Sequence, residues 1–186
     1  MLGRCMLALG CVLLSLRSDA FSQGSPICEV NTLPLIEMSA TLSDPPPVGW
    51  TLSAPRNYYV PGRMVRFQVQ QPNPAKRALG VLIWAKSAPF VGAGSFMLDA
   101  GGLYQFVPAP APCAQWALSH VSPAPKSPAQ LRFDWLPPNA GASNGVVIVR
   151  AFLIEACGVS GGCRAHQALT PVLVLQPALF VDGFEL

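Results

Sequence analysis

The chain has 186 residues, of which 51% are hydrophobic and only 11% are charged. This length and apolar content suffice to bury the core of one domain, and the apolar fraction argues against a disordered chain. The formal net charge is +3, and it falls to +2 if residues 1–20 are removed as a leader, because two basic residues and one acidic residue go with them. A nearly neutral protein has no electrostatic basis for binding nucleic acid.

Residues 1–20 have the three parts of a secretory signal peptide. Arg4 gives the positive start, residues 5–16 the apolar stretch, and residues 18–20 a small-residue cleavage site. The apolar stretch holds about a dozen residues, whereas a bilayer span needs about 20. A lipoprotein signal ending at Cys11 is the alternative, but it would halve the apolar stretch, and Ala8 and Leu9 fit a lipobox poorly. We therefore expect a secreted or periplasmic/cell-surface protein, with no transmembrane segment after signal removal.

Removal of this leader leaves four cysteines: Cys28, Cys113, Cys157 and Cys163. An even number in an exported chain predicts disulfides, and four cysteines allow three connectivities, which the sequence leaves open. The glycine-rich loop between Cys157 and Cys163 is flexible enough for a local bridge, and Cys28 would then pair with Cys113. Zinc is the alternative, but neither pair has Cys-x-x-Cys spacing, and an oxidising compartment disfavours free thiols. We expect no metal and no cofactor.

The predicted elements begin after a polar, proline-marked lead-in at residues 21–46, which runs into a stiff spacer at residues 44–47. Tyr59-Val60-Pro61-Gly62 then predicts a type II turn, because Pro61 sets φ and Gly62 permits a positive φ. Residues 64–70 alternate in polarity and place Val65, Phe67 and Val69 on one face, as in a half-buried strand.

Residues 79–86 form an apolar run, which is best interpreted as a central strand buried on both faces. Further strands are expected at residues 96–98, 103–106, 116–121, 131–136, 146–154 and 173–175. About seven to nine short strands with closely spaced turns predict an all-β, antiparallel β-sandwich with little helix. We expect the sandwich to span residues 47–178 and a tail to follow at residues 179–186.

The order of several short motifs resembles the reeler domain, the module that opens reelin and the spondins and recurs in bacterial exported proteins. These motifs are Tyr59-Val60-Pro61-Gly62, Phe96-Met97-Leu98-Asp99-Ala100, Ser119-His120 with Lys126, and Phe133-Asp134-Trp135-Leu136-Pro137-Pro138. The resemblance covers residues 40–160 and departs from the family's strings at Ser95, Ser119 and Leu136.

The resemblance implies an immunoglobulin-like sandwich and a disulfide from the N-terminal segment to the middle of the domain, which would join Cys28 to Cys113. It also singles out six motif residues: Tyr59, Pro61, Gly62, His120, Phe133 and Trp135. The last eight residues, Leu179 to Leu186, resemble an ending found on exported proteins of Gram-negative bacteria and indicate a bacterial source.

Two sets of side chains are candidates for a ligand surface. Trp50 and Trp116 are expected to expose rings that could stack on sugars, whereas Trp84 and Trp135 lie in apolar strands and are expected in the core. Arg66 and Arg132 alternate with core positions, so they must point to the opposite face of their strands. There they would form part of a basic face for anionic polysaccharide, whose candidate members are Arg63, Arg66, Lys76, Arg77, Lys86, Arg132 and Arg150. Ordinary solvated charge is the alternative at this net charge.

Catalysis is disfavoured. A hydrolase triad can be written from Ser95, His120 and Asp134, with Asp134 expected on a strand next to that of His120. The Gly-x-Ser-x-Gly elbow of such enzymes is absent around Ser95, and His120 is expected to be a hydrogen-bonded structural residue. We interpret the chain as a secreted, non-catalytic binding or adhesion module for glycans or surface polymers. The alternatives are a structural envelope protein with extracellular protein partners and, less favoured, a hydrolase that uses His120.

Overall fold

The computed structural model describes residues 24–25, 27–29, 41–42, 49–87, 91–107, 113–139, 145–157, 163–168 and 173–177. At residues 41–42, 157, 163–168 and 177 the description is limited to the backbone. The predicted signal at residues 1–20, the spacer at 44–47 and the tail at 179–186 lie outside the described residues.

The larger sheet is built around two long antiparallel strands, β5 (Ala78–Ser87) and β11 (Val147–Cys157), with Ala85 opposite Val149. On the far side of β5 lie β9 (Ala117–His120) and then β8 (Tyr104–Phe106); on the far side of β11 lie β12 (Cys163–Ala168) and then β1 (Thr41–Leu42). Three short strands join this sheet off the main path: β13 (Leu173–Pro177) on β11, β3 (Tyr58–Tyr59) on β13, and β6 (Val91–Gly92) on β5.

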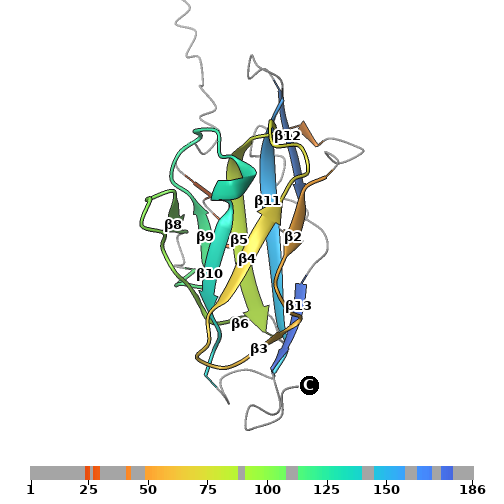
Figure 1. The fold of residues 1–186 in the computed structure, drawn as a ribbon. Helices are drawn as coiled ribbons and strands as arrows, with labels where there is room; N and C mark the ends of the chain where they lie inside the picture. Colours follow the sequence, from red (N-terminus) through yellow and green to blue (C-terminus); the bar gives the residue numbers. More distant parts are fainter. Residues whose placement is uncertain are drawn as a thin grey trace, which may run out of the picture.

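The smaller sheet has four antiparallel strands in the order β2 (Thr51–Ser53), β4 (Val65–Gln70), β10 (Arg132–Leu136) and β7 (Ser95–Phe96). Figure 1 shows β2, β4 and β10 lying in front of β5, β9 and β11 of the larger sheet. Among the described residues the only helical element is a 3-10 turn at Pro128–Gln130. The molecule is therefore a β-sandwich, which confirms the predicted fold class.

The main core lies between the sheets, and the alternation in β4 explains how it is filled. Val65, Phe67 and Val69 are buried, while the intervening side chains of β4 face outward. Across the gap, β5 and β11 contribute inward-facing aliphatic residues. Phe67 packs against Trp135 with ring centroids 5.8 Å apart, and Trp135 is fully buried. Burial of these apolar side chains is the main stabilising contribution to the sandwich.

The larger sheet also buries part of its outer face. Leu82 and Trp84 of β5 and Phe152 and Ile154 of β11 form a second apolar cluster on the side away from the main core. Ile27 and both cysteines of a disulfide pack on this cluster. Because residues on both faces of β5 are buried, the prediction of a central strand buried on both faces is confirmed.

Strand β12 was not predicted from the sequence. Residues 163–168 read Cys-Arg-Ala-His-Gln-Ala, which lacks the apolar alternation of a half-buried strand. The segment nevertheless pairs with six consecutive residues of β11 and, on its other side, with β1 in parallel. Backbone hydrogen bonding to a long neighbour, which no local pattern reports, accounts for this strand.

Candidate functional site

The Tyr-x-Pro-Gly motif forms a structural corner at one end of the sandwich. The N–H of Arg63 donates to the carbonyl of Val60 at 3.0 Å, and Gly62 has a φ of 75°, as a type II turn requires. Tyr59 is buried edge-on against Trp135, and its hydroxyl donates to the carbonyl of Gly145 at 3.1 Å. This corner links β3 to the core.

His120 is buried where β9 meets β5. The N–H of Val81 donates to its Nδ1 at 3.2 Å, and the ring lies so close to Gly80 that a Cβ there would come within 2.8 Å of Cε1. The neighbouring Ser119 Oγ donates to the carbonyl of Val81 at 3.1 Å and accepts from the N–H of Ser25 at 2.7 Å. These contacts give His120 and Ser119 a role in joining strands.

The hydrolase triad that can be written from Ser95, His120 and Asp134 is not assembled in the structure. His120 belongs to β9 in the larger sheet, whereas Asp134 belongs to β10 in the smaller sheet, so the expected neighbouring strands are in fact in different layers. Asp134 accepts hydrogen bonds from Arg66, and Ser95 is opposite Leu136 in the β10–β7 pair. The expectation that Asp134 lies on a strand next to that of His120 was wrong, because β9 and β10 are consecutive in the chain but belong to different sheets.

Lys126 is a second buried polar residue of the reeler-like motif set. Its Nζ donates to the carbonyls of Leu79, Ser122 and Ala124 at 3.1, 2.7 and 2.9 Å. Desolvation lowers the pKa of Lys126 to about 8. The side chain ties the 121–127 loop to the start of β5, a role that sequence analysis did not assign, because its acceptors are backbone atoms that carry no sequence signal.

Trp50 was predicted to expose its ring, and this prediction was wrong. Its exposed fraction is 2%, and its Nε1–H donates to Glu155, a buried residue of β11. Lys76 donates to the other carboxylate oxygen of Glu155. Trp50 thus bridges from the start of β2 in one sheet to β11 in the other, which the proline spacer before it gave no reason to expect.

Trp116 is half-buried and lies against the second apolar cluster. Gly92 approaches its ring so closely that a Cβ there would be 2.1 Å from Cδ1. The Nζ of Lys86 lies 5.5 Å from the ring centroid. Much of the indole surface is therefore already in contact with the protein, and the use of Trp116 as a ligand surface stays a prediction.

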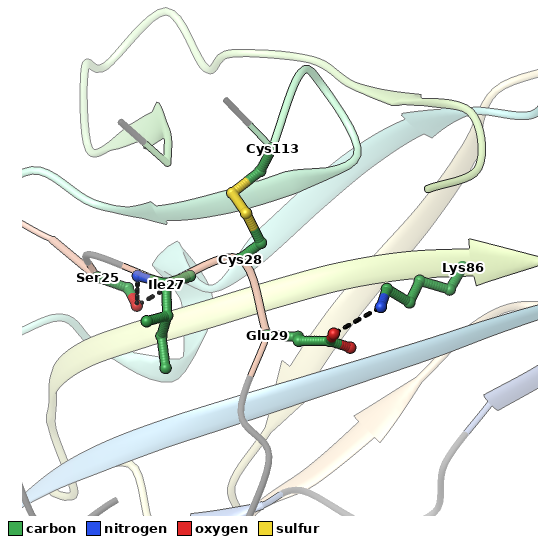
Figure 2. Close-up of a disulfide and its surroundings, with 6 residues drawn as sticks. All are labelled: Ser25, Ile27, Cys28, Glu29, Lys86 and Cys113. Carbon is green, nitrogen blue, oxygen red and sulfur yellow. Dashed lines mark hydrogen bonds and ion pairs between the residues drawn. A yellow bond between two sulfur atoms is a disulfide. The ribbon is translucent and has the colours of Figure 1, made fainter. Parts of the chain in front are cut away.

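The outer face of the larger sheet is covered by a short segment that we call the strap, residues 24–25 and 27–29. Cys28 of the strap is bonded to Cys113, with 5.4 Å between the Cα atoms, and Glu29 forms an ion pair with Lys86 at 2.6 Å. Figure 2 shows the disulfide and the ion pair holding the strap beside β5. The predicted Cys28–Cys113 bridge is confirmed.

The outer face of the smaller sheet remains accessible in the described part of the molecule. Arg66 Nε and Nη2 donate to the two oxygens of Asp134 at 2.6 and 2.7 Å, and Arg132 is exposed on the same side. The strand register places Arg66 opposite Asp134 and Arg132 opposite Gln68. Arg66 and Arg132 thus point away from the core, as the alternation predicted. The hydrogen bond and charge of Asp134 raise the pKa of Arg66, which stays a cation.

Two apolar side chains extend this face toward its β7 edge. Met97 and Leu136 have exposed fractions of 49% and 39%, and the N–H of Met97 donates to the carbonyl of Asp134 at 2.9 Å. We define this candidate surface, called the binding face below, by its residues: Arg66, Gln68, Met97, Arg132, Asp134 and Leu136. It combines two cations, one carboxylate, one amide group and apolar surface, and its residues include no aromatic ring.

Among the described residues, no group of three or more His, Cys, Asp or Glu side chains could hold a metal ion. The described part of the chain also contains no helix that is long and apolar enough to cross a membrane.

Comparison with known proteins adds evidence on the fold. No family model and no curated protein sequence match this chain. Fragment 1 of the human F-spondin reeler domain is 17% identical with a TM-score of 0.47, and the match covers 72% of this chain and 83% of that chain. Fragment 2 is 18% identical with a TM-score of 0.49, and the match covers 66% of this chain and 91% of that chain.

The Reelin-N domain of F-spondin is 16% identical, and its match covers 77% of this chain and 88% of that chain with a TM-score of 0.50. At this identity the likeness concerns the fold alone, and it supports the reeler-type sandwich that the motif order predicted.

Proposed function

We propose that this protein is an exported, non-catalytic binding module that uses the binding face of its smaller sheet to hold an anionic surface polymer or glycan. The observation that carries this proposal is the position of Arg66 and Arg132, which lie diagonally across the β4–β10 pair on its outer face, while the core-facing residues of the same strands are buried. The reeler-type fold and the Cys28–Cys113 bridge support an extracellular setting.

The binding face has no exposed tryptophan, which limits the kinds of contact through which it could recognise a ligand. Trp50, Trp84 and Trp135 are all at least 96% buried, so they cannot stack on a sugar ring. Recognition through this face therefore depends on charge and hydrogen bonds. Arg66 already holds Asp134, which leaves Arg132 as the cation best placed to contact an anionic group.

The test is retention of the mature protein on immobilised heparin and on lipopolysaccharide over a salt gradient. We expect Arg66→Ser with Arg132→Ser to elute at lower salt than the wild type, because surface attraction between charges weakens with each cation lost and with added salt. The matched comparison is between the single variants Arg132→Ser and Arg150→Ser, because each removes one exposed arginine; Arg150 belongs to β11 and lies on the outer face of the other sheet. Equal shifts for both variants, or no retention of the wild type, would reject the proposed ligand face.

A protein partner is the second candidate, and the exposed Met97 and Leu136 favour it. Methionine and arginine are enriched at protein interfaces, and both types occur on the binding face. For this candidate, Met97→Ser with Leu136→Ser should abolish capture of a defined envelope protein in a pull-down, whereas the double arginine variant should retain part of it. The candidate loses its basis if the apolar variant captures the same protein at the wild-type level.

A further inference from the structure

We propose that Cys157 and Cys163 form a second disulfide, which closes the hairpin between β11 and β12. The observation behind this is the strand register, in which Cys157 of β11 lies directly opposite Cys163 of β12. The two residues are the last and the first of their strands, so they flank the hairpin connection. This inference is independent of the proposed ligand face, because it concerns the other sheet.

The register meets the geometric requirement for a bond. Directly opposed residues of an antiparallel pair have Cα atoms about 4.5 to 5.5 Å apart. Disulfides are compatible with Cα separations of about 4.4 to 6.8 Å. Opposed residues of a pleated pair also place their Cβ atoms on the same face of the sheet. The backbone therefore needs no rearrangement to bring these two cysteines into bonding range.

The first disulfide removes the competing pairings. Cys28 is bonded to Cys113, and the four cysteines at positions 28, 113, 157 and 163 are all that remain once the predicted leader is removed. Of the three connectivities, only the one that joins Cys157 to Cys163 is compatible with this bridge. The six paired positions between β11 and β12 hold the two cysteines in this arrangement.

The chemistry is a two-electron oxidation. The S–H bonds of Cys157 and Cys163 break and one S–S bond forms, while two electrons and two protons pass to a disulfide-bearing oxidant, which is reduced to two thiols. Exported proteins meet such oxidants in the compartment where they fold.

The bridge has a structural consequence at the edge of the larger sheet. β12 pairs with β11 on one side and, in parallel, with β1 on the other, with Thr41 opposite Ala165. A covalent link at the start of β12 would hold this strand, and hence the strand that the lead-in adds to it, against β11. The two disulfides would then secure the lead-in at two separate places on the larger sheet: the strap at Cys28 and β1 through β12.

The test is a peptide map of the exported protein after removal of residues 1–20, alkylated without reduction and digested with trypsin. Cleavage after Arg150 and Arg164 releases residues 151–164, which contain both Cys157 and Cys163 and no other cysteine. We expect this peptide to carry no alkyl group and to be two hydrogens lighter than its reduced form, and to take two alkyl groups after reduction. The same map reports the first bridge separately, as residues 21–56 linked to residues 87–126.

Three results of the map would overturn the inference. The first is alkylation of residues 151–164 before reduction. The second is their linkage to residues 21–56 or 87–126, and the third is their linkage to a second copy of themselves. The matched variant is Cys163→Ser, in which Cys157 should become alkylated while the link between residues 21–56 and 87–126 persists. If Cys157 stays protected in that variant, it bonds elsewhere and the inference fails. The wild-type map decides the question even if the variant does not fold.

Discussion

The outer faces of the two sheets differ in what lies over them. On the smaller sheet, Arg66, Arg132 and their neighbours face solvent, and no described segment covers them. On the larger sheet, Leu82, Trp84 and Phe152 form an apolar cluster that the strap and the segment around Cys113 cover. The first face is exposed to solvent, whereas the part of the second face beneath the strap belongs to the folded core.

The local sequence encodes this difference. β4 alternates between apolar and polar residues, so only one of its faces can be buried without cost. β5 is apolar on both faces and must be covered twice, which makes the strap a requirement of the larger sheet. A covered outer face has to be stabilised by groups from elsewhere in the chain, and here the disulfide and the Glu29–Lys86 ion pair supply the link.

Truncation of a buried side chain beneath the strap should have the largest effect on the free energy of unfolding. Phe152→Ala empties part of the second apolar cluster, and we expect it to lower the free energy of unfolding by about 3 to 5 kcal/mol. Gln70→Ala, on the outer face of β4, should change it by less than about 0.5 kcal/mol. Urea denaturation of both variants makes the comparison, and similar losses would mean that the two outer faces do not differ as described.

Removal of the disulfide that holds the strap should cause the second-largest loss of stability. Cys28→Ser with Cys113→Ser opens a bridge with a sequence separation of 85, and removal of a native disulfide costs roughly 2 to 5 kcal/mol. If the strap also dissociates, an apolar dye should bind to the uncovered cluster before the protein unfolds. A stable variant without dye binding would show that noncovalent contacts alone hold the strap in place.

Trp50→Phe tests the bridge between the sheets at Glu155. Phenylalanine keeps most of the ring but lacks the Nε1–H, so the buried carboxylate loses one of its hydrogen bonds. We expect a loss of about 1 to 3 kcal/mol in the free energy of unfolding, because a buried acceptor is left with one donor fewer. Thermal denaturation measures this loss, and an unchanged midpoint would indicate that Lys76 alone satisfies Glu155.

Burial of Lys126 predicts a pH dependence. Its pKa is about 8 in the folded protein, below the ordinary value of 10.5, so the unfolded chain binds more protons between these values. The stability contributed at Lys126 should therefore rise with pH from about 8 toward 10.5, by at most about 1.4 kcal/mol per pH unit. Below pH 8 the cost of burying the charge is fully present.

Lys126→Met provides the reference for this pH dependence. As the pH rises from 8 to 9.5, the free energy of unfolding of the wild type should increase relative to that of the variant. This range avoids the ionisation of tyrosines in the unfolded chain, which acts in the opposite direction because burial raises the pKa of Tyr104. A constant difference would show that Lys126 has the same pKa in both states.

The sequence predicted those parts of the fold that local patterns encode. The period of two in β4 and the apolar run of β5 predicted both strands and their buried faces, and the alternation placed Arg66 and Arg132 outward. Long-range partners carried no such signal. Trp50 is buried where its Nε1–H reaches Glu155, a residue 105 positions away in the chain. Strand β12 forms because β11 provides its hydrogen-bonding partner.

The most direct test of the account compares Arg132 of the smaller sheet with Arg150 of the larger sheet, both of which are exposed. An arginine-specific dicarbonyl reagent labels the protein with and without heparin, and mass spectrometry measures the labelling rate at each residue. If the binding face is on the smaller sheet, heparin will slow the labelling of Arg132 and leave Arg150 unchanged. Protection of Arg150 alone, or equal protection of both, would contradict the account.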